Sequence, residues 1–287
     1  MPPMVGGIFY EHGHRMIATF VGALTVILAA WLWKADERRW VKLLGLGALM
    51  AVIMQGVLGG LTVLFLLPTP VSVLHATLAQ SFFTLTVVIA LVTSAGWRRL
   101  APLGDTASAR TKRIAVCATV MVLVQLVLGA WMRHSDAGLA ILDFPLSYGH
   151  VIPQTSPDAL LEINGMRIDR GLAPVDAPQV WIHFAHRVGA LLTAFLVLWL
   201  VIHILRTYHQ EPRLREPALI LGVLLIMQGV LGALTVWTGK GVEVATTHVA
   251  LGALLLATSA FLTVRVFGLF ALGTQEIRPY APEFSRP

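Results

Sequence analysis

Apolar residues fill long stretches of this chain, and polar residues are confined to the short segments between them. Spanning the hydrocarbon core of a bilayer as a helix takes roughly 20 mostly apolar residues. Seven stretches are long enough, at about Phe9–Trp33, Val41–Leu67, Val71–Ala95, Ile114–Met132, Trp181–Leu205, Ala218–Trp237 and Ala245–Phe270. The pattern predicts an all-α polytopic membrane protein with seven transmembrane helices.

The connections between these stretches alternate in charge. The first, third and fifth are rich in arginine and lysine, and the second and sixth carry little charge. The long fourth connection, residues 134–179, is net acidic. Because basic loops stay on the cytoplasmic side of a membrane, we expect a multi-pass protein of the cell membrane with a cytoplasmic C-terminus.

Composition supports lipid as the main solvent. Only 13% of the residues are charged and 56% are hydrophobic, whereas a soluble domain carries about 25% charged residues. The net charge of +6 therefore indicates basic loops at a membrane face, and no nucleic-acid partner is expected. Cys117 is the only cysteine, so no intrachain disulfide forms. An Arg- and Ser-rich presequence is absent, which favours a bacterial plasma membrane.

The sequence contains an internal repeat. Gln55–Val63, QGVLGGLTV, recurs as Gln228–Val236, QGVLGALTV. The repeat predicts two related four-helix bundles with parallel topology. We divide the chain into an N-terminal half, residues 1–97, a cytoplasmic linker, residues 98–113, and a C-terminal half, residues 114–287, with the outer loop 134–179.

The two repeats differ at their beginnings. The second has a complete helix, Ile114–Met132, before the one that begins near Trp181, whereas only eight residues precede the helix that begins near Phe9. We therefore expect the first helix of the first bundle to be missing from this sequence, through a shortened chain or a late start codon. A natural seven-helix protein is the alternative.

Four histidines lie inside the predicted membrane helices: His14, His75, His186 and His248. His14 and His186 occupy matching positions in the two repeats, as do His75 and His248, and all four fall in the outer half of the membrane. Intramembrane histidine is costly and usually functional. Two facing imidazoles can ligate haem iron, so each repeat is expected to hold one haem.

Simpler roles remain open for parts of this pattern. An intramembrane histidine can instead hydrogen-bond a carbonyl of a neighbouring helix. Gln55, Gln125 and Gln228 each precede small residues and are interpreted as markers of close helix packing. His203 has no repeat partner and is interpreted as an ordinary interfacial residue.

The surroundings of the histidines differ between the halves. Glu11 precedes His14 by three residues and shares its helix face, whereas His183 holds the matching position before His186. This asymmetry suggests that one haem is altered while the other moves electrons. Arg15 and Arg187 adjoin the histidines and are candidate contacts for haem propionates, with snorkelling to headgroups as the alternative.

These motifs resemble the haem A synthase family. The resemblance rests on Glu11–Arg15 (EHGHR), Leu74–Thr77 (LHAT), His183–Arg187 (HFAHR), Thr247–Gly252 (THVALG) and the outer-loop motifs Ser135–Leu139 and Asp143–Gly149. It covers almost the whole chain. Many members also carry a cysteine pair in an outer loop of the N-terminal half, which this sequence lacks.

The resemblance implies an eight-helix oxidoreductase that oxidises the C8 methyl of haem O to the formyl group of haem A for terminal oxidases. It implies His14 and His75 as ligands of the substrate haem, His186 and His248 as ligands of haem b, and Glu11 as catalytic. Haem O synthase and an electron donor are the implied partners, and a homo-oligomer is left open. The alternatives are a dihaem b-type electron-transfer cytochrome and a haem carrier.

Overall fold

The computed structural model describes residues 7–101, 103 and 108–270, with the side chains of residues 7–11 excepted. Seven long helices make up most of this part: α1 Gly7–Ala35, α2 Arg39–Leu64, α3 Thr69–Thr93, α5 Ser108–His134, α7 Ala177–Thr207, α8 Pro212–Trp237 and α9 Val242–Leu269. The short helices are α4 Ala95–Arg98, the 3₁₀ turn η1 Ala137–Leu139 and α6 Pro157–Ile168. No strand occurs in the described ranges, so the predicted all-α class is confirmed.

All seven predicted spans are helices long and apolar enough to cross a membrane. Several boundaries differ from the predicted ones. The apolar run that continues to Leu67 is helical only to Leu64, because Leu66 and Leu67 adopt positive φ and Pro68 follows. Pro70 then lies in the first turn of α3, where an N–H group would have no partner inside the helix, so its absence costs nothing. The α6 helix in the outer loop was not predicted.

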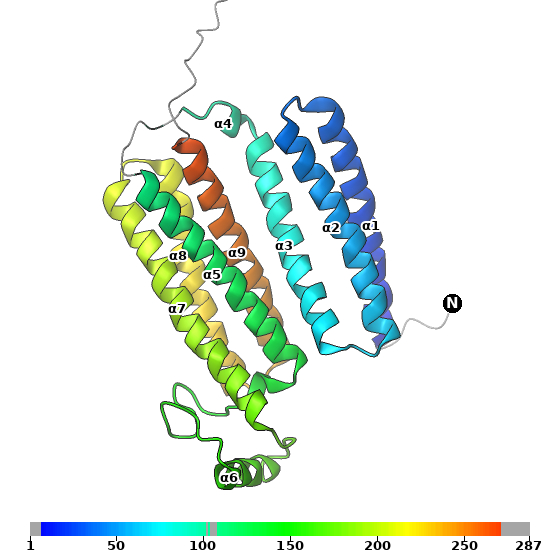
Figure 1. The fold of residues 1–287 in the computed structure, drawn as a ribbon, viewed down its shortest axis with the longest axis vertical. Coiled ribbons are helices and arrows are strands. Elements are labelled where there is room, and N and C mark those ends of the chain that lie inside the picture. Colours follow the sequence, from blue (N-terminus) through cyan, green and yellow to red (C-terminus); the bar gives the residue numbers. More distant parts are fainter. Residues whose placement is uncertain (1–6, 102, 104–107, 271–287) are drawn as a thin grey trace, which may run out of the picture.

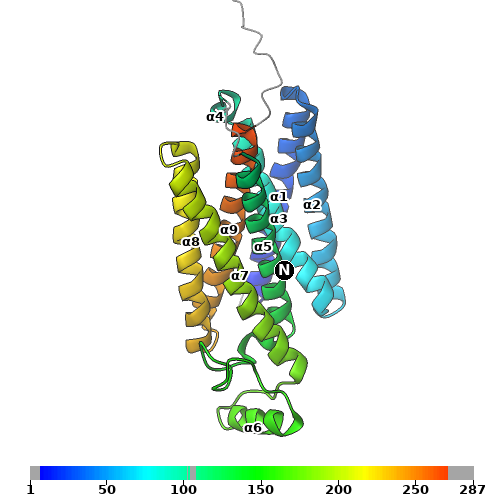
Figure 2. The ribbon, with the colours of Figure 1, turned by 60° about the vertical axis from the view of Figure 1, so that its left-hand side comes forward.

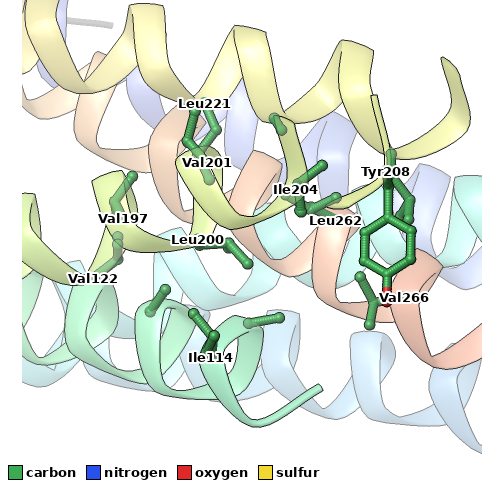
Figure 3. Packing of buried hydrophobic residues seen from close by; sticks show 14 of the residues in the cluster. Ile114, Val122, Val197, Leu200, Val201, Ile204, Tyr208, Leu221, Leu262 and Val266 are labelled. Carbon is green, nitrogen blue, oxygen red and sulfur yellow. The ribbon is translucent and has the colours of Figure 1, made fainter. Parts of the chain in front are cut away.

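The C-terminal half is a closed four-helix bundle in which α5 packs on α7 and α9, and α8 packs on α7 and α9 (Figure 1). Its core is mostly aliphatic, with Tyr208 and Phe270 beside the aliphatic side chains, and lies toward the end opposite α6. Figure 3 shows this packing, with Ile114 and Val122 from α5, Val197, Leu200, Val201 and Ile204 from α7, Leu221 from α8, and Leu262 and Val266 from α9. Such interlocking stabilises helix association in lipid mainly through van der Waals contact.

The N-terminal half contributes three long helices in the described residues. α2 packs between α1 and α3, and α3 joins the two halves by packing on α5 and α9 (Figure 1). The arrangement is consistent with two related bundles, of which the first has three described helices. The predicted boundaries of the halves and the linker stay predictions. α5 begins at Ser108, within the predicted linker, residues 98–113.

The helices run in two opposite directions. α1, α3, α7 and α9 all begin at the end of the molecule that carries α6, here called the α6 end (Figures 1 and 2). The basic connections lie at the opposite end. Two of them contain an ion pair with the pattern acid-x-Arg, Asp36 with Arg38 at 2.6 Å and Glu211 with Arg213 at 2.6 Å. The histidines are therefore brought to one end by helix direction alone.

The outer loop folds over the α6 end with its own small core. Ala137, Ile141, Ile163 and Val180 are buried together there. Ser156 caps α6 and a capping box of Asp176 and Gln179 begins α7. These caps satisfy N–H groups that have no partner inside a helix. The capping box also fixes where α7 begins, and with it the position of His186.

Candidate functional site

The four intramembrane histidines lie at one level of the molecule. His14, His75, His186 and His248 each fall within roughly the first three turns of α1, α3, α7 and α9. These four helices begin at the α6 end (Figure 1). The histidines, each near the start of its helix, therefore share a depth near that end. The sequence predicted this common level from helix direction.

Within each half, the two histidines approach each other. His75 interacts electrostatically with His14, and His186 interacts electrostatically with His248. The fold therefore brings together the pairs that the repeat predicted. The described residues contain no group of three or more His, Cys, Asp and Glu side chains able to hold a metal ion. A two-ligand site built from imidazoles is the arrangement these pairs offer.

His186 lies against α5. The Nε2 of Gln125 donates a hydrogen bond to the main-chain oxygen of His186 at 2.9 Å and lies 3.0 Å from its Nδ1. The ring itself packs on Gly129, where an added Cβ would be only 3.0 Å from Cε1. One turn later on α7, Gly189 makes room for Gln125, since a Cβ there would collide with Oε1 of the glutamine.

His248 lies against α8, where the glutamine approaches the other ring nitrogen. The Nε2 of Gln228 is 3.5 Å from Nε2 of the histidine, and the ring packs on Gly232, whose Cβ would be 3.4 Å from Cε1. Gly252 on α9 faces Gln228, since its Cβ would be 3.2 Å from Nε2. The Nδ1 of His248 is buried without a hydrogen-bond partner.

His75 repeats this arrangement against α2. The Nε2 of Gln55 donates to the main-chain oxygen of His75 at 3.0 Å, and the ring packs on Gly59 with Cε1 at 3.3 Å from an added Cβ. Its Nδ1 is also buried without a partner. His14 differs, because it is exposed on the side of α1. The C-terminal pair lies within the four-helix bundle of α5, α7, α8 and α9.

The three glutamines are functional candidates that the sequence did not identify. They were interpreted as markers of helix packing, and their neighbouring glycines do permit close approach. The structure adds that each amide lies against one of the histidines. The available signal was the recurrence of glutamine four residues before glycine on α2, α5 and α8.

Glu11 and its counterpart occupy different settings. Glu11 lies in α1, one turn before His14, and its side chain is outside the described part of the structure. His183, at the matching position of α7, is only 3% exposed, and its Nδ1 accepts a hydrogen bond from the N–H of Ile141. His183 therefore holds the outer loop, which leaves the carboxylate as a feature of the N-terminal half.

The two arginines also differ. Arg15 is exposed on α1. The guanidinium of Arg187 donates to the main-chain oxygens of Leu146, Asp143 and Ile141, at 2.7, 2.8 and 3.3 Å. Arg187 thus fastens the outer loop over the C-terminal pair, and its Nε remains buried without a partner. That N–H is still able to bind an anionic group.

A cavity of about 470 Å³ lies in the outer loop beside α6. It is lined by Leu142, Asp143, Tyr148, Gly149, Glu162, Met166 and Arg170. The carboxylate of Asp143 accepts the main-chain N–H groups of Tyr148 and Gly149 at 2.6 and 3.0 Å, and burial raises the pKa of the Tyr148 hydroxyl. These bonds shape the loop that covers the α6 end.

Comparison with known proteins agrees with this geometry. The family model COX15-CtaA, described as cytochrome oxidase assembly protein, matches residues 6–260. The chain belongs to this family. It is similar to heme A synthase of Halalkalibacterium halodurans, with 28% identity over 88% of this chain and 78% of the relative. Heme A synthase of Chelativorans sp. is 31% identical over 87% of this chain and 67% of the relative.

The family membership confirms the resemblance that the histidine motifs indicated. The matched region includes α1 to α8 and most of α9, and with them all four histidines. Heme A synthase of Rhizorhabdus wittichii, 29% identical over 87% of this chain and 69% of its own length, adds a further relative of the same name. The similarity therefore extends over both halves of the molecule.

Proposed function

We propose that this chain is a haem A synthase, an oxidoreductase that converts the C8 methyl group of haem O to the formyl group of haem A. The observation that carries the proposal is the pair of neighbouring histidines in each half of a COX15-CtaA family member. The haem A it makes would serve terminal oxidases. A dihaem b-type electron-transfer cytochrome is the second candidate, favoured by the two similar histidine pairs alone.

The side chains present fit a haem. Neutral imidazole is a good axial ligand for its iron, and each pair supplies two imidazoles at one depth. The Nδ1 atoms of His75 and His248 are buried without a hydrogen-bond partner among the described residues. No such bond therefore fixes the tautomer of these rings, and Nε2 can be the nitrogen that binds a metal. Glycines remove the side chains that would fill the space beside three of the four rings.

We infer that the two sites have different occupants. His14 and His75 would hold the substrate, haem O, because Glu11, whose counterpart in the C-terminal half is His183, lies one helix turn before His14. His186 and His248 would hold haem b, because the closed bundle and the outer loop enclose them. Arg15 and the free Nε of Arg187 are the groups offered to propionates.

The bound haem groups would supply the iron redox chemistry that oxidising a methyl group requires. The chain's own residues would position the haem groups. His14 and His75 would orient the porphyrin, and the fold keeps the histidines at one end of the helices. Glu11 lies one helix turn from His14, where its carboxylate can accept a proton or stabilise a positive charge developing at the oxidised carbon.

The decisive experiment is haem extraction from membranes that contain this chain together with a haem O synthase. The synthase proposal predicts haem A and its hydroxylated intermediate, whereas a dihaem cytochrome or a haem carrier yields neither. Glu11→Gln, which removes the charge but keeps the size, should retain both haems and lose most haem A. Unchanged haem A output from Glu11→Gln would reject the catalytic role of this carboxylate.

We further propose that the α6 end faces outward and that the C-terminus is cytoplasmic, in a bacterial plasma membrane. The basic connections support this, since they lie at the end opposite α6. Haem O synthase would supply the substrate and a separate donor the electrons, with a homo-oligomer compatible with the fold. Single cysteines placed at Ser156 and at Arg99, in a Cys117→Ala chain, test the orientation: only the first should react with an impermeant reagent in whole cells.

A further inference from the structure

The connection between α8 and α9 places a lysine across the α6 end of the C-terminal bundle. Lys240 has a φ of 63°, and its main-chain N–H donates to the Thr235 oxygen at 2.8 Å, which fixes the turn. The side chain lies on Gly138, where an added Cβ would be 3.2 Å from Cδ and 3.4 Å from Cε and Nζ of the lysine. Gly138 belongs to η1, which packs on α5 and α7. Lys240 therefore reaches from the α8–α9 turn to the α5 and α7 side of the bundle.

The ammonium group of Lys240 is available to a ligand. Within the described ranges, no hydrogen bond or ion pair joins its Nζ to another residue. The acidic residues nearest in the two connections, Asp136 and Glu243, are exposed. The stem of the lysine is held against the outer loop, whereas its charge is not neutralised by a described partner.

A second cation reaches the same loop from α7. Arg187 donates to the Ile141 oxygen, three residues beyond Gly138, and its Nε is buried without a described partner. Arg187 and Lys240 thus contact the loop that covers the C-terminal histidine pair, one from α7 and the other from the α8–α9 turn. Two cations at the same end of the bundle favour an anionic ligand there.

The N-terminal half has no cation at the matching position. Leu67 stands four residues after Val63, the end of the repeated segment, just as Lys240 stands four residues after Val236. Leu67 has a φ of 61°, so both turns have the same left-handed conformation at this residue. Because leucine is accommodated there, the backbone does not require lysine. The positive charge is a property of the C-terminal turn alone.

The interior of the bundle decides which way a haem between His186 and His248 would point its propionates. Toward the basic end the interior is filled by the mostly aliphatic cluster of Figure 3, where a carboxylate without a partner is strongly unfavourable. The α6 end is close by. His248 lies six residues from the start of α9, and Gly129, which contacts the His186 ring, lies five from the end of α5. These spacings are roughly 8–9 Å of helix, so the propionate edge faces the end where Lys240 lies.

We propose that Lys240 binds a propionate carboxylate of the haem held by His186 and His248 and orients the propionate edge of that haem toward the α6 end. The inference rests on the proposed function, which places a haem at this pair. An ammonium group forms strong, charge-assisted hydrogen bonds with a carboxylate. Since the stem of Lys240 packs on Gly138, the same side chain joins the haem to the outer loop.

The test compares haem b with its dimethyl ester, in which both propionates are uncharged. The full chain, purified with its haem, carries His14→Ala and His75→Ala so that only the C-terminal pair is measured. It is equilibrated with an equimolar excess of haem b and the ester, and the ratio of the two bound forms is read after extraction. The wild-type lysine should favour haem b. Lys240→Met should lower the ratio of haem b to ester by about 10–100-fold, the effect of one hydrogen bond to a charged group.

A ratio separates propionate binding from a structural role, because a weakened fold lowers the affinity for both forms alike. Lys240→Arg keeps a cation and should retain the wild-type ratio. Arg170→Met is the matched control, since it removes one positive charge from an exposed position of the same outer loop. An unchanged ratio in Lys240→Met would overturn the inference.

The midpoint potential of the bound haem gives a second readout. Lys240→Met should lower it, because a positive charge beside the haem disfavours the ferric state. If Lys240→Met does not fold, which size-exclusion chromatography reveals, the wild-type lysine decides: equal binding of haem b and its ester contradicts the inference.

Failure of the proposed function is read separately. His186→Ala and His248→Ala should abolish the low-spin haem spectrum of the C-terminal half, and a retained spectrum would reject haem ligation by this pair. Haem A output from membranes reports on the synthase reaction itself. Neither result is altered by the ratio of haem b to ester, so a wrong propionate contact and a wrong function give different outcomes.

Discussion

The amide of Gln125 contacts His186 at two points, 2.9 Å from its main-chain oxygen and 3.0 Å from Nδ1 of its ring. The first contact fixes the position of α7 along α5, and the second contacts the imidazole ring. Both contacts are made by the same atom, Nε2 of the Gln125 amide. The position of a ligand and the register of two helices are therefore set by one residue.

The glycines opposite the rings give a graded prediction. An added Cβ would lie 3.0 Å from His186 Cε1 at Gly129 but 3.4 Å from His248 Cε1 at Gly232. The second distance is ordinary van der Waals contact and the first forces the ring to move. Gly129→Ala should lose haem and about 1–3 kcal/mol of stability, and Gly232→Ala should stay near wild type.

Haem absorbance and thermal unfolding in detergent measure both variants. The two substitutions are matched, since each adds one methyl group beside one proposed haem ligand. Equal haem content in the two variants would contradict the geometry of the Gly129 contact.

Arg187 is predicted to hold the outer loop. Its guanidinium donates to three main-chain oxygens of that loop, and hydrogen bonds from a charged donor contribute about 1.5–3 kcal/mol each. Arg187→Lys keeps the charge but cannot span three acceptors, so limited proteolysis within residues 134–179 should accelerate. The exposed Arg170 provides the control: Arg170→Lys should leave the cleavage rate as it is.

Much of the site followed from sequence because two simple signals coincide. Hydropathy gave seven spans, and the repeat placed His14 and His75 in register with His186 and His248. Helix direction then fixed their common depth. Such inferences need only chain length and periodicity, which are visible without knowing how any two helices pack.

The roles of Gln125, His183 and Arg187 could not be predicted in the same way. Each depends on a residue of another element, such as Ile141 N–H beside His183 or the loop oxygens around Arg187. The sequence offered propionate binding for Arg187 because charge alone was visible. Tertiary contacts decide which of its N–H groups are engaged.

His203 also gained a role from packing. Predicted to be an ordinary interfacial residue, it lies with Nε2 2.9 Å from Oγ1 of Thr111, which is itself 3.2 Å from the hydroxyl of Tyr208. Thr111 is fully buried. Thr111→Val keeps the shape and removes the hydroxyl, so it should cost about 1–3 kcal/mol by leaving Nε2 of His203 short of a partner.

A double-mutant cycle checks this network by thermal unfolding. His203→Phe added to Thr111→Val should restore part of the loss, because removing both partners spares the unpaired group. Thr235→Val is the control, since Thr235 bonds only the Leu231 oxygen of its own helix among the described contacts. Additive losses in the double mutant would show that Thr111 and His203 act independently.

Asp36 makes the stability of the basic end depend on pH. Its carboxylate accepts three hydrogen bonds from Arg38, at 2.9, 2.9 and 2.6 Å, and the side-chain bonds lower the pKa of Asp36 from 3.8 to about 2. Arg38 in turn donates to the Val92 oxygen at 3.0 Å. The pair thereby links the α1–α2 connection to the end of α3.

The sign of the pH dependence follows from the lowered pKa. The unfolded chain binds the proton more readily than the folded one, so the stabilisation is complete above the unfolded value of 3.8 and is lost as pH falls towards 2. Asp36→Asn should therefore unfold at a lower temperature than wild type at pH 7, and the two should converge near pH 2. The exposed neighbour Glu37 supplies the control, because Glu37→Gln should leave the unfolding temperature unchanged across this range. A constant difference between wild type and Asp36→Asn from pH 7 to pH 2 would show that the ion pair does not set this dependence.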